Sequence, residues 1–356
     1  MISTFTPLQH PGGGFGGGHG QLAHVAPTYA AVLSLASVGA SALSMVDRRA
    51  LLSWLHSLKS SSGSFAVCSG GEADVRGVYC ALTVISLLRL PTDGGLVANT
   101  SAYLASCQTY EGGFAATPNG SEAHGGYTYC ALAALMILHP PARLAATVDL
   151  PALIRWLSAR QYAPEGGLSG RTNKLVDGCY STWVGACWPL IEACVGGGDG
   201  DVPLWSREAL VRYILSAAQA PFGGLRDKPG KGPDFYHTAY NLLGYSAAIH
   251  SHAYHPDATT TTAAEGEEAE GGGGEGGEEG LPLLTPFNWK AGDVIDGLVV
   301  GHPGWPDIRW DEDKPAWEKG QPGDRVKPSH LLFNVSVEYV EDVVRWCDAL
   351  VEGDDV

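Results

Sequence analysis

A short glycine-rich motif recurs along the chain and divides it into similar units. Each copy ends in an apolar residue, and the copies end at Phe15, Phe65, Phe114, Leu168 and Leu225. The steps between them are 50, 49, 54 and 57 residues. A near-constant period of this size is typical of repeat proteins, in which each unit buries its apolar face against the next. The spacing therefore predicts a repeat architecture.

Two kinds of helix-like stretch alternate with the motif. Stretches that follow it are apolar on nearly every side, as expected of a helix buried on most faces, and they cover residues 26–38, 75–90, 126–138, 181–194 and 236–249. Stretches that precede the later copies are more amphipathic, and they cover residues 49–60, 99–108, 150–161 and 206–219. One inner and one outer helix per unit predict an all-α ring or solenoid with few strands, in which the glycines allow sharp turns.

The composition changes sharply after the last unit. Residues 1–256 are expected to form the helical domain, whereas residues 257–281 consist mainly of Thr, Ala, Glu and Gly. Low hydrophobicity and like charges predict that this insert is a disordered, solvated spacer. Residues 282–356 are expected to return to the same barrel, first as a Trp- and Pro-rich loop at 304–324 and then as a closing helix at 336–351.

The charge balance argues against a nucleic-acid partner. The formal net charge is −16, and seven of the glutamates lie between Glu265 and Glu279. The eight cysteines show no paired spacing, which favours reduced thiols in a reducing compartment. The first residues lack the features of a signal peptide, and no apolar run is long enough to span a bilayer. We therefore expect a soluble, cytoplasmic protein without stable membrane insertion.

Three side chains in two neighbouring loops have the chemistry of metal ligands. Asp177 and Cys179 flank a glycine at the start of an apolar helix, so both can point into one cavity, and the equivalent loop of the next unit supplies His237. Asp, Cys and His around an open position are the pattern of a catalytic zinc site. Spacing alone is also compatible with a buried thiol and an unrelated core histidine, so both interpretations stay open at this point.

Further polar and aromatic residues recur at the same places in the units. A ring of helices would gather the loops at one rim, where a set of donors suits a diphosphate: His124, Arg171, Lys174 and Tyr180. Asp227 could hold Mg²⁺ against the same phosphates. Below the rim, an aromatic-lined well for an apolar chain is expected from Tyr79, Tyr127, Trp183 and Tyr240. Each residue taken singly is better explained by a solvated loop or an ordinary core position, whereas the whole set favours a binding site.

Several stretches resemble the β subunits of protein farnesyltransferases, in the CaaX prenyltransferase β-subunit family. They are "GGFGGGHGQLAHVAPTYAA", "EADVRGVYCAL", "EGGFAATPNGSEAHGGYTYCALAAL", "EGGLSGRTNKLVDGCYSTW" and "GGLRDKPGKGPDFYHTAYNLLG". The resemblance implies an α–α barrel (toroid) that binds zinc and farnesyl diphosphate and pairs with a helical-repeat α subunit. Its substrates would be CaaX-ending proteins such as small GTPases, whose cysteine thiol forms a thioether with the farnesyl group.

The resemblance also implies roles for individual residues. The zinc ligands would be Asp177, Cys179 and His237, with Asp227 associated with magnesium. The diphosphate would be bound by His124, Arg171, Lys174 and Tyr180. The prenyl chain would contact Arg76, Tyr79, Tyr127, Cys130, Trp183 and Tyr240, and the CaaX peptide would contact His24, Ala26, Glu72, Arg76 and Tyr236.

Other interpretations remain beside this one. Asp227 favours a farnesyltransferase over a type I geranylgeranyltransferase β subunit, which typically carries lysine there. A terpene cyclase would need a DxDD motif, and none occurs in the helical body. An inactive toroid scaffold is the third alternative. Related chains carry further helices, and a tryptophan at the floor of the prenyl pocket, before their first Gly-Gly-Phe motif, so the resemblance implies a toroid that is N-terminally shortened and accepts longer prenyl donors more readily.

Overall fold

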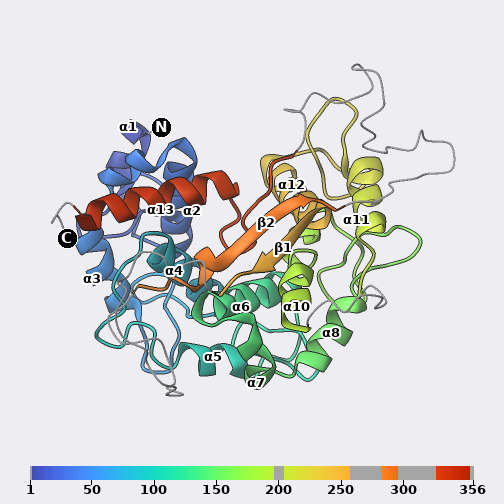
Figure 1. The fold of residues 1–356 in the computed structure, drawn as a ribbon, viewed down its shortest axis with the longest axis horizontal. Coiled ribbons are helices and arrows are strands. Elements are labelled where there is room, and N and C mark those ends of the chain that lie inside the picture. The colour runs from blue at the N-terminus through green and yellow to red at the C-terminus, as the bar shows by residue number, and fades with distance from the viewer. Residues whose placement is uncertain (1, 196–203, 257–281, 296–325, 353–356) are drawn as a thin grey trace.

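The computed structural model describes residues 2–195, 204–256, 282–295 and 326–352 (Figure 1). The inner helices are α2 (Val25–Val38), α4 (Val75–Leu87), α6 (Gly125–Leu138), the pair α9 (Tyr180–Trp183) and α10 (Cys187–Val195), and α12 (Phe235–Ile249). The outer helices are α3 (Arg48–Leu58), α5 (Thr100–Ser106), α8 (Leu150–Ser158) and α11 (Arg207–Tyr213), which continues into a π-helical turn, η4 (Ile214–Ala218). Shorter elements are α1 (Ile2–Phe5), η1 (Thr6–Leu8), η2 (Ala40–Met45), η3 (Pro141–Arg143), α7 (Leu144–Thr147) and η6 (Thr285–Asn288). The remaining elements are β1 (His250–Tyr254), β2 (Trp289–Val294) and α13 (Val337–Glu352).

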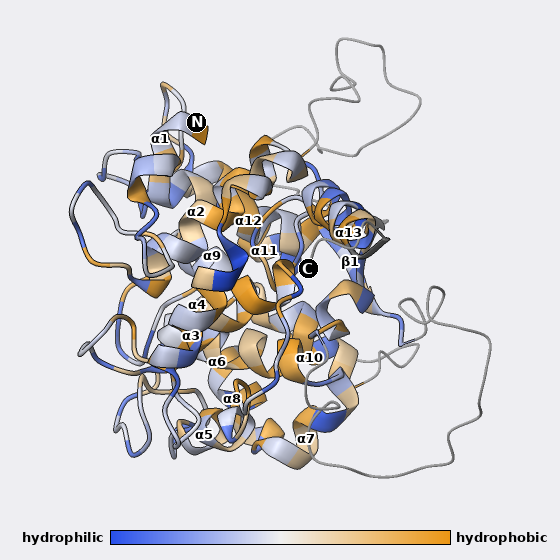
Figure 2. Cartoon of the chain, turned by 90° about the vertical axis from the view of Figure 1, so that its left-hand side faces the viewer, coloured by the Kyte–Doolittle hydropathy of each residue, from blue (hydrophilic) through white to orange (hydrophobic). Residues whose placement is uncertain are grey.

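The inner helices pack in sequence order, α2 on α4, α4 on α6, α6 on α9 and α10, and α9 on α12. Figure 2 shows hydrophobic residues on these inner helices, with more hydrophilic residues in the loops around them. Four of the five glycine-rich motifs bury their final residue completely, since Phe15, Phe65, Phe114 and Leu168 are all 0% exposed, and Leu225 of the fifth is 9% exposed. The alternation of inner and outer helices confirms the predicted all-α repeat.

One hydrogen bond recurs between the loops at the start of four inner helices, α2, α4, α6 and α9. The backbone N–H of Val25 donates to Val67 O at 2.8 Å, and that of Val75 donates to Ala116 O at 3.0 Å. The same bond joins Gly125 to Gly170 at 2.7 Å, and Gly178 to Asp227 at 2.7 Å. Because each bond links one unit to the next, the loops lie side by side and form one rim, as the sequence predicts.

A glutamine supports the outer helices in the same periodic manner. Gln108 Nε2 donates to Asp149 O at 2.9 Å, and its Oε1 accepts from Asp149 N–H at 2.8 Å. Gln161 repeats this with Ser206, at 2.8 Å for both bonds. Asp149 and Ser206 in turn cap α8 and α11 by accepting from backbone N–H groups. Each glutamine thereby fixes where the next outer helix begins.

Two parts of the structure differ from the prediction. The expected helix at 181–194 is split into α9 and α10, because Pro189 has no N–H to donate to Gly185 O and its ring crowds that carbonyl. A two-stranded antiparallel sheet, β1 with β2, pairs Tyr254 with Trp289 across the acidic insert. The predicted spacer at 257–281 and the Trp- and Pro-rich loop at 304–324 lie outside the described residues.

The C-terminal part of the chain closes onto the N-terminal units. The predicted closing helix is α13, which lies against α2 and α4 (Figure 1). Arg89 of the second unit forms an ion pair with Asp348 on α13, and the Arg48 guanidinium lies 5.9 Å from the Trp346 ring centroid. Val343 is completely buried. The first and last described segments therefore stabilise one another.

Among the described residues, no single helix has the length and apolar character to cross a membrane. By length and composition alone, α6 and residues 141–147 are together long and apolar enough to cross a membrane, as a pair bent by 115°.

Candidate active site

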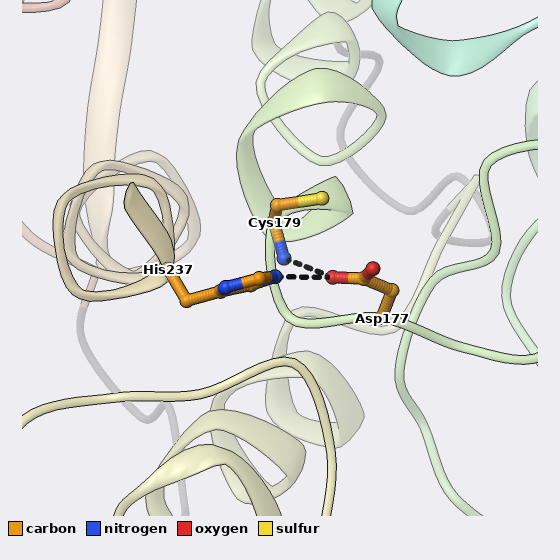
Figure 3. A group of neighbouring side chains, drawn as sticks. All are labelled: Asp177, Cys179 and His237. Carbon is orange, nitrogen blue, oxygen red and sulfur yellow. Dashed lines mark hydrogen bonds and ion pairs between the residues drawn. The ribbon is translucent and has the colours of Figure 1, made fainter. Parts of the chain in front are cut away.

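Asp177, Cys179 and His237 meet at the rim where α9 and α12 begin (Figure 3). One ligand atom from each residue lies within 4.8 Å of the other two. His237 Nε2 lies 3.3 Å from Asp177 Oδ1, which also accepts a hydrogen bond from Cys179 N–H at 2.9 Å. The predicted convergence of the three side chains is confirmed. Within the described residues, this is the His, Cys, Asp or Glu group with metal-site dimensions.

The imidazole of His237 is oriented by Asp234, one turn earlier. Asp234 caps α12, because its Oδ1 accepts from His237 N–H at 2.7 Å. Its Oδ2 lies 2.7 Å from His237 Nδ1. The carboxylate therefore holds the proton on Nδ1 and leaves the Nε2 lone pair facing Asp177 and Cys179. A carboxylate behind a ligating histidine is the usual support of a metal site.

The glycine between the two ligands is required by the packing around it. A Cβ at Gly178 would lie 2.5 Å from the Asn241 side chain and 2.6 Å from Arg226 O. Asn241, which is 0% exposed, donates to His237 O at 2.8 Å. Gly178 thus lets the loop of Asp177 approach α12 closely enough for His237 to join the cluster.

The free thiol of Cys179 is in an environment that disfavours its ionisation. Burial raises the pKa of Cys179 well above its usual value, and the neighbouring Asp177 carboxylate raises it further. A cation at the cluster would reverse this, because it would compensate both negative groups. The electrostatics and the donor atoms are therefore those of a site that accepts a cation.

His124 and Tyr180 form a second polar pair beside the cluster. His124 caps α6 by accepting from Gly126 N–H at its Nδ1, at 3.0 Å. Its Nε2 lies 3.0 Å from Tyr180 Oη. Burial lowers the pKa of His124, and the charge of Arg171 lowers it further. A neutral imidazole with its proton on Nε2 donates to Tyr180, so the phenol can direct its own proton to a ligand.

The other residues predicted to bind the diphosphate or its magnesium ion lie on loops of the rim. Arg171 is half-exposed, and its Nη1 bonds to Glu122 Oε2 at 2.9 Å. Lys174 is exposed and has no side-chain partner among the described residues. Asp227 forms an ion pair with Lys228, and its backbone O accepts from Tyr213 Oη at 2.8 Å. Asp227 is joined to the metal cluster through the rim bond from Gly178.

An aromatic side chain from each inner helix lies below the rim and forms a continuous aromatic belt. Its members are Tyr29, Tyr79, Tyr129, Trp183 and Tyr240. Successive ring centroids are 5.6, 5.6, 5.4 and 4.3 Å apart. The belt places Trp183 beside Tyr240 and links both to Tyr79 through Tyr129.

The loop before α13 closes one side of the aromatic belt. Tyr79 donates to Leu332 O at 2.8 Å, and Tyr129 donates to Leu331 O at 2.5 Å. The Asn334 amide bonds to both phenols at 3.1 Å. Cys130, predicted to line the well, is buried next to Tyr129 on α6. The phenols therefore have polar partners in the C-terminal segment and are held in place.

The residues predicted to contact a peptide are spread along the rim. His24 caps α2 by accepting from Ala26 N–H at 3.0 Å. Arg76 is exposed, lies 3.8 Å from Glu72, and places its guanidinium 5.8 Å from the Tyr127 ring. Tyr236 accepts a hydrogen bond from Trp183 Nε1 at 2.9 Å, which joins the rim to the aromatic belt.

Three residues of the site were not predicted from the sequence. Asp234 could have been found from its place three residues before His237 at a helix start, where an N-cap is expected. Tyr29 and Tyr129 could have been found from the repeat, because every member of the aromatic belt lies 14 or 15 residues after the end of its motif. Tyr127, which was predicted to line the well, lies two residues nearer the start of α6 and packs against His124 with ring centroids 5.3 Å apart.

Residues 1–333 match a family described as "Prenyltransferase alpha-alpha toroid domain". A protein farnesyltransferase subunit beta from Pyricularia oryzae is 51% identical over 272 residues, which are 70% of this chain and 53% of the relative. One from Schizosaccharomyces pombe is 45% identical over 258 residues, which are 71% of this chain and 66% of the relative. The chain thus spans about half the length of the first relative and 66% of the second.

A solved structure shares the fold. Candida albicans protein geranylgeranyltransferase-I complexed with GGPP is similar with a TM-score of 0.56 and 22% sequence identity, over 69% of this chain and 75% of that chain. At this identity the likeness shows the fold alone. The predicted α–α barrel of repeated helix pairs is confirmed.

Proposed function

Because this chain belongs to the prenyltransferase family whose domain is an alpha-alpha toroid, we propose that it is the β subunit of a zinc-dependent protein farnesyltransferase. It transfers the farnesyl group of farnesyl diphosphate to the cysteine thiol of proteins that end in a CaaX sequence. A prenyltransferase α subunit is its partner, in a heterodimer. The enzyme works in the cytoplasm, in keeping with free thiols at Cys68, Cys80 and the other described cysteines.

The observation that carries the proposal is the cluster of Asp177, Cys179 and His237. One carboxylate, one thiol and one imidazole within 4.8 Å fit Zn²⁺, and three protein ligands leave a fourth position open. Asp234 supports this fit, because it fixes the imidazole in the tautomer that a metal needs. Zinc bound there would supply an open coordination position for the peptide thiol and lower the pKa of that thiol.

The rim residues account for the departure of the diphosphate. In the reaction, the peptide sulfur forms a bond to C1 of the farnesyl group, the C1–O bond breaks, and the thiol proton passes to solvent. Negative charge then grows on the leaving diphosphate. Arg171 and Lys174 are the cations that compensate it, and Tyr180, oriented by His124, donates a hydrogen bond. Asp227 would hold Mg²⁺ at the same phosphates.

The farnesyl chain binds at the aromatic belt, and the CaaX peptide binds along the rim. The farnesyl chain lies against Trp183, Tyr240 and Tyr79, with Tyr127, Cys130 and Arg76 beside it, because an apolar chain gains about 0.8 kcal/mol for each buried methylene. The CaaX peptide lies along the rim near His24, Ala26, Glu72, Arg76 and Tyr236. Tyr236 therefore stands where the two substrates meet, since it contacts both His237 and Trp183.

The proposal is tested by co-expressing the full chain with a prenyltransferase α subunit. Zinc content is measured, and transfer to a fluorescent CaaX peptide is assayed with farnesyl or geranylgeranyl diphosphate. We expect about one zinc per chain and transfer from the fifteen-carbon donor. Transfer from the twenty-carbon donor alone would instead identify a type I geranylgeranyltransferase subunit. A chain that binds neither zinc nor donor would be an inactive scaffold.

A further inference from the structure

The carboxylate of Glu111 joins two loops that are far apart in the sequence. Its Oε1 accepts from Ala123 N–H at 3.0 Å, and its Oε2 accepts from Thr172 Oγ1 at 3.0 Å. Ala123 immediately precedes His124, and Thr172 immediately follows Arg171. One side chain therefore fixes the separation of two residues that the proposed function assigns to the diphosphate.

A buried cation lies near this carboxylate. Arg160 is 4% exposed and stacks on Trp156 at 4.9 Å. Its Nε and Nη1 have no hydrogen-bond partner in the described part of the chain. Burial lowers the pKa of Arg160, and Tyr162 and then Glu111 oppose that shift. Glu111 is thus placed where a negative charge stabilises its surroundings, in addition to its two hydrogen bonds.

The same position in the neighbouring unit provides a natural comparison. Glu111 and Glu165 both lie three residues before the end of their glycine motifs. Within the described residues, Glu165 makes no side-chain hydrogen bond, whereas Glu111 makes two to other loops. The contacts of Glu111 therefore do not follow from the repeat itself. They occur at the junction of the third and fourth units, where His124 and Arg171 lie.

A second link between these loops is made by Arg171 itself. Its guanidinium bonds to Glu122 at 2.9 Å, and both side chains are about half exposed. When Arg171 turns to a diphosphate, this ion pair must loosen, because the guanidinium exchanges one anion for another. The bond between Glu111 and Thr172 does not involve Arg171, so it persists and keeps the loop in place.

We propose that Glu111 is a positioning residue for the diphosphate-binding loops and acts through Ala123 and Thr172. This inference rests on the proposed function, since it concerns the same anion site. Glu111 does not contact the anion. It holds the backbone on which His124 and Arg171 are carried, so that both side chains reach one diphosphate without rearrangement.

The test uses inorganic pyrophosphate as the probe and the full chain purified with its α subunit. Glu111→Ala removes both bonds, and we expect the Kd for pyrophosphate to rise about tenfold, as for the loss of hydrogen bonds to a charged group. Thr172→Ala should raise it several-fold, and Thr172→Ser should restore it because the hydroxyl returns. Glu165→Ala is the matched control and should bind pyrophosphate as the unmutated protein does.

Pyrophosphate affinity unchanged in Glu111→Ala would overturn the inference while leaving the proposed function intact. Loss of zinc in Glu111→Ala, with zinc retained in Glu165→Ala, would assign Glu111 a general structural role and also overturn it. Absence of pyrophosphate binding by the unmutated protein would overturn the proposed function, and the inference with it. Glu111→Gln should bind nearly normally, because its amide can still accept from Ala123 and donate to Thr172.

Discussion

Asp234 decides which nitrogen of His237 faces Asp177 and Cys179, although it is not itself part of that cluster. Its two oxygens have separate tasks, since one caps α12 and the other holds the imidazole proton. The bonds that it accepts from His237 lower the pKa of Asp234, so the carboxylate stays ionised. The Asp234 carboxylate thus both caps the start of α12 and fixes the orientation of the His237 imidazole.

Asp234→Ala is expected to weaken zinc binding by about 10- to 100-fold, because the imidazole loses its orientation. Asp234→Asn should fall between, since asparagine still caps the helix and its amide oxygen can accept from Nδ1. Competition with a coloured chelator measures the zinc affinity. Asp47→Ala is the control, because Asp47 caps α3 at a distance from the cluster. Unchanged zinc affinity in Asp234→Ala would contradict this role.

Replacing Arg171 or Lys174 with Ala is expected to reduce turnover by about tenfold or more, because each change removes a cation from the leaving group. Steady-state rates with farnesyl diphosphate give the measurement. Lys327→Ala serves as the control for a lost surface cation, since Lys327 pairs with Glu338 on α13. If both variants turn over normally, the two residues have no part in the departure of the diphosphate. Asp227→Ala should abolish the dependence on Mg²⁺ and leave zinc bound.

At the level of helices and turns, the glutamine contacts have one exception. Lys59 occupies the position of Gln108 and Gln161, and its Nζ donates to Gly63 O at 2.9 Å and to Thr100 Oγ1 at 2.5 Å. No carboxylate compensates its charge among the partners that the structure describes. Burial accordingly lowers the pKa of Lys59 to about 8. The second unit therefore carries a cation where its neighbours carry a neutral amide.

Lys59→Gln is expected to leave stability at pH 7.5 unchanged or higher. The folded-state pKa of Lys59 lies below its unfolded value, so the unfolded chain binds more protons between pH 8 and 10.5. Stability of the unmutated protein should therefore rise with pH across that range, relative to the variant. Urea unfolding at pH 7.5 and 9.5 compares the two proteins. An identical pH response in both would show that Lys59 does not titrate as described.

The elements that the sequence predicts well are those with a local signal. The apolar stretches at 75–90 and 126–138 became α4 and α6, because their side chains are buried on nearly all sides. The sheet of β1 and β2 was missed, since its strands are short and separated by a long insert, and pairing between distant segments leaves little local trace. Tyr129 was missed for a different reason, because the choice between Tyr127 and Tyr129 depends on which helix face turns inward.

Across the whole molecule, the segment before α13 connects the sheet, the aromatic belt and the C-terminal helix. His330 is 3% exposed in this segment, and its Nε2 lies 3.0 Å from Pro286 O while its Nδ1 accepts from Leu332 N–H. These bonds require a neutral imidazole. Burial lowers the pKa of His330 to about 4, and that of His252 on β1 to about 3. A fall in pH should therefore destabilise the packing of this C-terminal segment against the rest of the fold.

The folded-state pKa of His330 is below the unfolded value of 6.5, so its stabilising effect is present above pH 6.5 and is lost as the pH falls toward 4. Between pH 7.5 and 5.0 this one group should reduce the free energy of unfolding by about 2 kcal/mol. His330→Gln should lose less stability over the same interval, by about that amount. Guanidinium unfolding at the two pH values measures the difference. Equal losses in both proteins would exclude His330 as a source of acid sensitivity.

The N-cap residue of four inner helices differs in chemistry although its backbone is extended in each. His24, Asp74, His124 and Asp234 all accept a hydrogen bond from the first turn of their helix. Duplication of a unit therefore adds one new side chain to the rim without altering the packing beneath it. Divergence at that position changes the available chemistry from imidazole to carboxylate at little structural cost. An array of identical units would in this way hold several independent sites for mutation, all at the same rim.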